Sequence, residues 1–252
     1  MRKNAAITSV ILGILLIIVW EYLARGLSNL ILPNPTAVFL KLQEGIVSGD
    51  FLPHLLTTLT EVMLGLFIGI VFGVGLGILI GENEFLRKVS FPYIVISQAI
   101  PKIALAPLFM LWFGYGMTSK IVITALICFF PLLEATASAV RQVNQQQLDL
   151  FRLIHASQMQ TLWHLKIPAG LPTILQGLRV AVILALVGAI VGEFIGANQG
   201  LGALIIASQS MMDTTLMFAI LILLSMIGFL LYGLVNLLES KLLRYKKGDT
   251  KH

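Results

Sequence analysis

The chain has 252 residues, of which 58% are hydrophobic and only 12% are charged, and its mean hydropathy is +0.94. A soluble domain carries about a quarter charged residues, so this composition excludes a globular protein that covers its surface with polar groups. Six spans of about 20 residues would use roughly half of the chain. The composition therefore predicts a membrane protein and leaves no room for a large soluble catalytic domain.

Six continuously apolar runs predict transmembrane helices, because the strands of a membrane barrel alternate in polarity over about ten residues. The predicted spans are residues 5–24, 55–80, 89–113, 121–140, 171–197 and 215–238. The first run follows Arg2 and Lys3 and lacks an obvious small-x-small cleavage site, which indicates a signal anchor. The predicted fold is thus an all-α membrane protein that forms a single transmembrane domain over 1–252.

The distribution of basic residues predicts the orientation in the membrane. With the N-terminus in the cytoplasm, twelve Lys and Arg residues fall inside and only Arg25, Lys41 and Lys120 fall outside. The positive-inside rule then places both termini, and a basic tail over 239–252, in the cytoplasm. The net charge of +5 is therefore explained by topology and contact with lipid headgroups, and we expect no nucleic-acid partner.

Motifs of bond chemistry are missing from the sequence. It contains no G-x-x-x-x-G-K-[ST], H-E-x-x-H or G-x-S-x-G, and the four histidines lie outside or at the edges of the spans. His155 and His164 have no Cys or carboxylate at ligand spacing, and Cys128 is the only cysteine, so we expect no metal site. We therefore expect a non-catalytic protein without a cofactor of its own.

Glycines at intervals of four predict close helix packing. One face of the second span carries Gly65, Gly69, Gly73, Gly77 and Gly81, and the fifth span repeats the spacing with Gly188, Gly192 and Gly196. Small residues at this spacing let another backbone approach closely. The sequence leaves open whether these faces form a rigid bundle or a sliding interface of a transporter.

The third span contains Pro92, Pro101 and Pro107. Proline removes a backbone hydrogen bond and clashes with the preceding turn, so we expect a kinked or open helix near Ile100-Pro101-Lys102. Such breaks at membrane depth are tolerated where protein or water surrounds them, and they commonly line substrate paths.

Four of the charged residues inside the predicted spans are candidates for a translocation path or gate: Lys102, Glu134, Glu193 and Glu61. A central lysine costs about 2.5 to 3.5 kcal/mol on insertion scales, so Lys102 is expected to face the bundle or a wet cavity, where it would attract an anion. Glu61 and Glu193 are expected in the outer half, within reach of water. For each acid, structural hydrogen bonding and a transport role both stay open.

Two loops carry helical patterns. The outer segment contains a modestly amphipathic stretch around residues 37–46, and the inner loop over 141–170 is rich in Gln and is expected to be helical. Leu148, Phe151 and Ile154 fall on one face of this inner helix, with no apolar partner evident in the chain. This face indicates either a docking surface or packing beneath the bundle.

The inner loop also contains a spaced pattern. Asp149-Leu150-Phe151, three residues, His155, nine residues and Leu165-Lys166-Ile167-Pro168 resemble the E-A-A-x3-G-x9-I-x-L-P loop of permease subunits of binding-protein-dependent ABC importers. The spacing is complete, but Asp replaces Glu, Leu and Phe replace two Ala, and His stands at the Gly. Three further stretches look like the nitrate, sulfonate and taurine class: residues 32–38, 100–114 and 171–202.

The resemblance implies a type I ABC importer permease in the bacterial inner membrane. Its implied partners are a second copy of the chain, two cytoplasmic ABC ATPase subunits that bind ATP and Mg, and an external solute-binding protein. The matching loop positions imply an ATPase-coupling helix with Asp149, Leu150, Phe151, Arg152 and His155 at its docking face. The solute could be a sulfonate, nitrate or taurine-like anion, a vitamin precursor or an aromatic compound.

Three alternatives to this reading remain at the level of sequence. An ion-coupled secondary transporter would use the intramembrane Glu residues and need no ATPase, although we find no convincing internal repeat to support it. An intramembrane enzyme would need a base beside Ser97 or Ser225, and no His lies within the spans. A structural scaffold would leave the helical inner loop and the proline-broken span unexplained.

Overall fold

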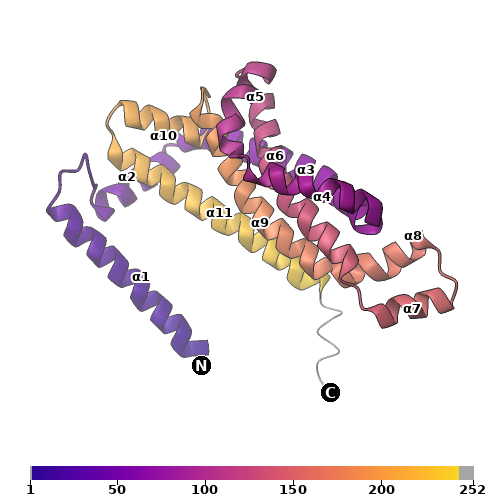
Figure 1. The fold of residues 1–252 in the computed structure, drawn as a ribbon. Helices are drawn as coiled ribbons and strands as arrows, with labels where there is room; N and C mark the ends of the chain where they lie inside the picture. The colour runs from indigo at the N-terminus through magenta and orange to yellow at the C-terminus, as the bar shows by residue number, and fades with distance from the viewer. Residues whose placement is uncertain (1, 244–252) are drawn as a thin grey trace. The chain divides into compact units, whose positions relative to one another are not determined.

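A computed structural model describes residues 2–243 of the chain and the side chains of residues 7–243 (Figure 1). The side chains of Arg2 and Lys3 and the tail residues 244–252 lie outside these ranges. The cytoplasmic location of the two basic ends therefore stays a prediction. Every regular element in the described part is helical, which confirms the all-α prediction.

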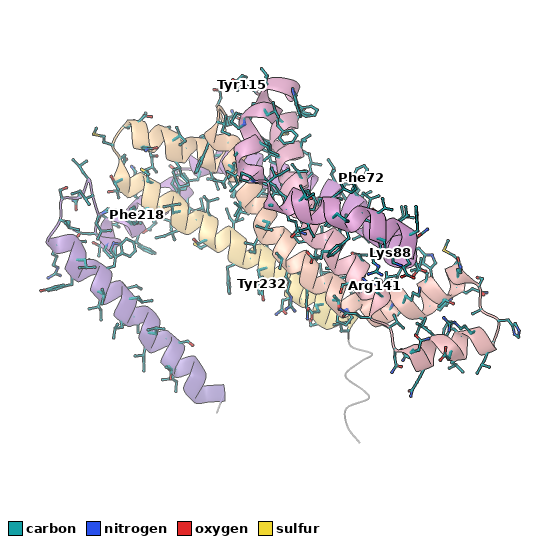
Figure 2. The ribbon with its side chains drawn as sticks, viewed as in Figure 1. Phe72, Lys88, Tyr115, Arg141, Phe218 and Tyr232 are labelled. Carbon is teal, nitrogen blue, oxygen red and sulfur yellow. The ribbon has the colours of Figure 1, made fainter. Side chains whose placement is uncertain are left out.

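Five helices are long and apolar enough to cross a membrane: α1 (Arg2–Arg25), α3 (Phe51–Glu82), α6 (Met117–Arg141), α9 (Ile167–Phe194) and α11 (Thr214–Leu242). A sixth span forms if α4 (Glu84–Ala99) and the segment Lys102–Phe113 are taken together, although they are bent by 81°. Large apolar side chains such as Phe72, which is 58% exposed, project outward from the helices (Figure 2). These helices agree with the predicted six-span architecture.

The predicted ends of the spans are shifted in several places. Helix α6 begins at Met117 rather than near residue 121, so Lys120 belongs to the helix and not to an outer loop. Helix α11 continues to Leu242, into the segment expected as a basic tail. The shorter elements are α2 (Pro35–Val47), which matches the predicted amphipathic stretch, α7 (Gln145–Leu153), α8 (Gln158–Thr161), a π-helical turn (Leu162–Lys166) and α10 (Leu201–Ser210).

The chain divides into two compact units, one formed by residues 1–57 and 198–227 and the other by 58–197 and 228–252. Within the first unit, the indole Nε1 of Trp20 donates to the carbonyl of Pro33 at 3.1 Å, and its ring lies 5.7 Å from that of Phe218. The hydroxyl of Thr214 donates to the carbonyl of Leu30 at 2.7 Å. These contacts tie the ends of α1 and α11 together inside this unit.

The second unit is organised around α6. A Cβ added at Gly73 of α3 would lie 2.9 Å from the carbonyl oxygen of Phe129, and one at Gly188 of α9 would lie 2.9 Å from Cα of Thr124. Helix α6 is therefore held between two glycine faces, as the spacing predicted for α3 and α9. Gly196 is an exception, because α9 ends at Phe194 and Gly196 follows it with φ +145.

The third span is broken where the prolines predict. Helix α4 ends at Ala99, Ile100 is extended (ψ 127), and a 3-10 turn over Lys102–Leu105 leads into α5 (Ala106–Phe113). Pro101 causes the break because it cannot continue the hydrogen-bond ladder of α4, whereas Pro107 occupies the first turn of α5, where no donor is needed. Pro92 lies inside α4 without ending it.

The glycine face of α3 generates a matched test. Gly73→Ala should destabilise the protein by about 1 to 3 kcal/mol, because its methyl group must displace the backbone of α6. Gly75→Ala on the same helix meets no atom within 4 Å and should leave stability unchanged or slightly raised. Thermal unfolding midpoints in detergent would measure both, and equal midpoints would show that the glycine face is not a packing constraint.

Candidate functional site

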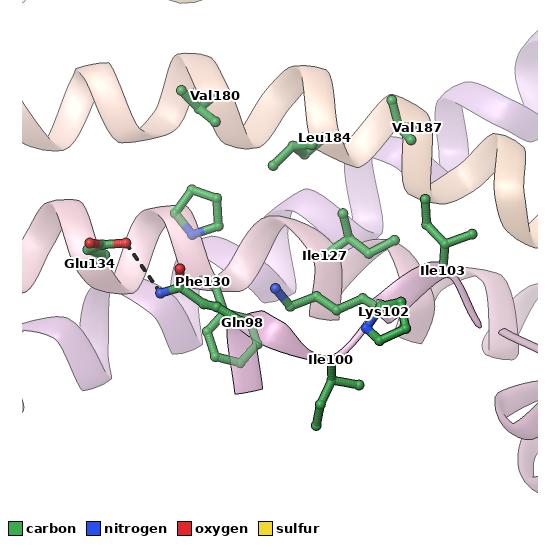
Figure 3. Close-up of a pocket in the computed structure, with 12 residues that line it drawn as sticks. Gln98, Ile100, Lys102, Ile103, Ile127, Phe130, Glu134, Val180, Leu184 and Val187 are labelled. Carbon is green, nitrogen blue, oxygen red and sulfur yellow. Dashed lines mark hydrogen bonds between the residues drawn. The ribbon is translucent and has the colours of Figure 1, made fainter. Parts of the chain in front are cut away.

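A cavity of about 520 Å³ lies where the broken span meets α6 and α9 (Figure 3). The break at residues 100–103 forms one wall, α6 contributes Ile127, Phe130 and Pro131, and α9 contributes Val180, Leu184 and Val187. Three polar side chains join these apolar walls, namely Gln98, Lys102 and Glu134. A mostly apolar pocket with a few polar groups is the usual form of a small-molecule site.

The two charges in this cavity are not joined to each other. The ammonium nitrogen of Lys102 lies 4.4 Å from the ring centroid of Phe130, a cation–π contact, and no carboxylate of the described residues pairs with it. The amide of Gln98 donates to Oε2 of Glu134 at 3.4 Å, which Figure 3 shows as a dashed line. The structure thus brings two of the four predicted path residues, Lys102 and Glu134, into one cavity.

The other two, Glu61 and Glu193, lie in a different place. Glu61 is 0% exposed and forms an ion pair with Lys120, which is itself 5% exposed. Glu193 is 1% exposed, and its Oε1 accepts a hydrogen bond of 2.6 Å from the hydroxyl of Thr58, three residues before Glu61 on α3. Neither acid lines the cavity, and the expectation that water reaches them is wrong for the chain as described.

This buried charge cluster, defined as Thr58, Glu61, Lys120 and Glu193, follows from the glycine packing. Gly192 lies beside Lys120, so a Cβ there would come within 3.0 Å of Cγ of Lys120. Because the glycines of α3 and α9 have no side chains, these helices pack closely against α6 and bury the charged groups between them. The sequence analysis did not identify Lys120 as the partner of Glu61. Lys120 lies four residues before Thr124 and eight before Cys128, and these three residues share the face of α6 that packs against the glycines of α3.

The inner loop contains two short helices, which corrects the prediction of one. Asn144 caps α7 with its side-chain oxygen, which accepts from the backbone of Gln146, and Ser157 caps α8 with a complete capping box. Between them the backbone of His155 has φ +51. His155 N donates to the carbonyl of Arg152 at 3.0 Å and Ala156 N to that of Phe151 at 3.0 Å, the two bonds of a Schellman motif.

The positive φ of His155 explains the pattern of the loop. This position calls for a left-handed residue that closes α7, and glycine adopts that conformation with no steric cost. His accepts it here, so the loop keeps its turn despite the departure from the usual glycine.

The apolar side of α7 is turned differently from the predicted face. Leu150, Leu153 and Ile154 are 57%, 76% and 65% exposed. Leu148 and Phe151 are half-buried, and Leu148 lines a groove of about 740 Å³ between the loop and the end of α3. Two of the predicted docking residues, Asp149 and Arg152, are exposed and pair with each other at 3.0 Å.

An ion pair connects the far end of the loop to α3. Lys166 Nζ lies 2.7 Å from Oε1 of Glu82, with side-chain exposures of 18% and 27%. Across the described residues, no group of three or more His, Cys, Asp or Glu side chains could hold a metal ion. The cavity and the exposed loop are two features of the second unit that are open to another molecule.

The amino-acid sequence of this chain is similar to that of known proteins. Residues 65–244 match the family described as binding-protein-dependent transport system inner membrane component. The formylaminopyrimidine transport permease protein ThiX of Halalkalibacterium halodurans is 37% identical over 98% of each chain. The putative aliphatic sulfonates transport permease protein SsuC of Bacillus subtilis is 32% identical over 97% of this chain and 90% of its own.

A solved structure supports the fold. An inward-facing structure of the MetNI methionine ABC transporter matches with a TM-score of 0.67 and 20% identity, over 76% of this chain and 95% of the other. At this level of identity the likeness concerns the fold alone. It agrees with the all-α permease architecture predicted from the sequence.

The buried charge cluster generates a stability prediction. Lys120→Met should destabilise the protein by about 3 to 5 kcal/mol, because it leaves Glu61 buried without its cation. Replacing both residues, Lys120→Met with Glu61→Met, should recover part of this loss. Lys88→Met, at a lysine that is 69% exposed, is the control and should change little. Thermal midpoints in detergent measure all three, and an undiminished midpoint for Lys120→Met would contradict the role of the pair.

The turn at His155 generates a second prediction. His155→Gly should stabilise the turn by about 1 kcal/mol, because glycine adopts positive φ without strain. His164→Gly, at a right-handed helical position nearby, should instead destabilise its turn by about 1 kcal/mol. Hydrogen exchange of the loop amides would slow about fivefold in the first variant and accelerate in the second. Faster exchange in His155→Gly would show that the imidazole itself holds the turn.

Proposed function

Because this chain belongs to the binding-protein-dependent transport system inner membrane component family, and is the non-catalytic permease subunit of an ABC importer in the bacterial inner membrane, we propose that two copies of it form the translocation pathway. An ATPase and a solute-binding protein are the partners that membership of this family implies. The finer proposal is a homodimer that binds two ATPase subunits, with ATP and Mg held on those subunits and not on this chain.

We propose that the solute passes through the cavity at the broken span. It combines apolar walls with Lys102 and Glu134, and it lies beside a broken span, where backbone and side chains are free to meet a passing molecule. We propose that Lys102 and Glu134 line the path, whereas Glu61 and Glu193 hold the helices together. This assignment rests on their burial, because both acids of the second pair are sealed from water.

Coupling to the ATPase is proposed for the inner loop. The observation that carries this assignment is the exposure of Leu150, Leu153 and Ile154 on a short helix fixed at both ends by caps. Apolar side chains on a cytoplasmic loop gain free energy when a partner covers them. Asp149, Arg152 and His155 surround this surface, and the Lys166–Glu82 pair connects the loop to the bundle.

The related permeases are named for several kinds of solute. One related permease is named for a formylaminopyrimidine and another for aliphatic sulfonates. We propose a small organic solute from this range, delivered by the binding protein. Ion-coupled transport without an ATPase is set aside, because the family is that of binding-protein-dependent importers.

The proposed assembly is tested by purifying the tagged chain from mild detergent and identifying its partners. We expect an ATPase subunit in equal amount to the permease, with vanadate-sensitive ATP hydrolysis. A homogeneous permease that moves ions alone in liposomes would overturn the proposal.

The docking surface generates a mutational prediction. Leu150→Asp or Ile154→Asp should reduce ATPase stimulation by about tenfold, because a charge replaces an apolar contact in the interface. Phe151→Asp should also reduce it, with some loss of stability, because Phe151 is half-buried. Val47→Asp on α2, where Val47 is 79% exposed, is the matched control and should have no effect. Undiminished stimulation in Leu150→Asp would remove α7 from the docking surface.

A further inference from the structure

The cavity at the broken span holds one positive and one negative side chain, and its formal charge is therefore zero. Lys102 has no carboxylate partner within the described residues, and Glu134 accepts only the long bond from Gln98. Each group consequently keeps the capacity to bind a solute, Lys102 as a donor and Glu134 as an acceptor. A site of this kind can serve both a donor and an acceptor on the same molecule.

A simple anion does not match this pair of charges. A sulfonate or nitrate would be attracted to Lys102, but it would also bring a negative charge into the cavity that contains Glu134. A solute with both an acceptor and a hydrogen-bond donor satisfies both side chains without adding net charge. The polar groups therefore favour a neutral or zwitterionic solute.

The walls of the cavity favour a flat ring. Ile127, Leu184 and Val187 present aliphatic surfaces, and Pro101, Pro131 and Phe130 add rigid rings around the same space. Burial of an apolar solute face against these aliphatic and ring surfaces lowers the free energy of binding, and a short sulfonate has little apolar surface to bury. A volume of about 520 Å³ lies within the range of small-molecule pockets and holds an aromatic heterocycle with its substituents.

We infer that this cavity binds an aromatic heterocycle that carries both a hydrogen-bond acceptor, which faces Lys102, and an amino or amide donor, which faces Glu134 and Gln98. The inference rests on the proposed function, because it names the class of solute that passes this site. It reverses the expectation that Lys102 selects an anion, since Glu134 shares the cavity.

The test measures binding to the purified permease–ATPase assembly in lipid nanodiscs without the binding protein. Equilibrium dialysis would compare a formylaminopyrimidine, which is flat and carries donors and acceptors, with ethanesulfonate, which is an aliphatic monoanion. We expect tighter binding of the pyrimidine. Lys102→Met and Glu134→Gln should each weaken it about tenfold to a hundredfold, as for the loss of a hydrogen bond to a charged group.

A matched pair of controls lies on α4. Lys88 and Glu84 form an exposed ion pair of 3.0 Å outside the cavity, and Lys88 is labelled in Figure 2. Lys88→Met and Glu84→Gln make the same chemical changes and should leave binding of both probes unaltered. In addition, Glu134→Gln should raise the affinity for ethanesulfonate several-fold, because it removes the negative charge that opposes this anion.

A steric variant keeps the test decisive if a charge variant fails to fold. Val180, which is 53% exposed on α9, lines the cavity, and Val180→Trp should block the pyrimidine while it leaves both charges in place. Ethanesulfonate binding that exceeds pyrimidine binding in the unaltered protein would overturn the inference. So would an assembly that hydrolyses ATP but binds neither probe, whereas an assembly without an ATPase would overturn the proposed function itself.

Discussion

The close approach of α3 and α9 to α6 is the constraint on which the rest of the second unit depends. Gly65, Gly69, Gly73 and Gly77 on one side, and Gly188 and Gly192 on the other, remove the side chains that would keep the helices apart. Lipid tails are as apolar as leucine, so dispersion contacts at such faces provide much of the association energy. The same closeness excludes water from Glu61 and Lys120, which makes their ion pair obligatory.

Two pairs of opposite charges in this chain have different surroundings and therefore different chemistry. Lys120 and Glu61 are enclosed by packed helices, where they form an ion pair with each other. Lys102 and Glu134 lie around a cavity beside a proline break, and each stays open to a further partner. The difference comes from the local backbone, because glycines close the first site and Pro101 opens the second.

Much of this arrangement is predictable from the sequence, because membrane helices and packing glycines have strong periodic signals. The six spans, the break at Pro101 and the glycine face of α3 follow directly from apolar length, proline chemistry and spacing by four. The partner of Glu61 does not, because hydropathy places Lys120 at a span edge and says nothing of which helix it meets. The rotation of α7 was missed because its apolar residues occupy two faces, and only the tertiary fold decides between them.

The proline break also divides the second unit into parts of different stiffness. Helices α6 and α9 are locked together by glycine contacts, and the Lys166–Glu82 pair fastens the inner loop to α3 of the same block. The segment around Pro101 has no helical ladder across it, so it bends more easily than its neighbours. We therefore expect a displacement of the inner loop to carry α3, α6 and α9 along together, and the cavity wall around residues 100–103 to change shape most.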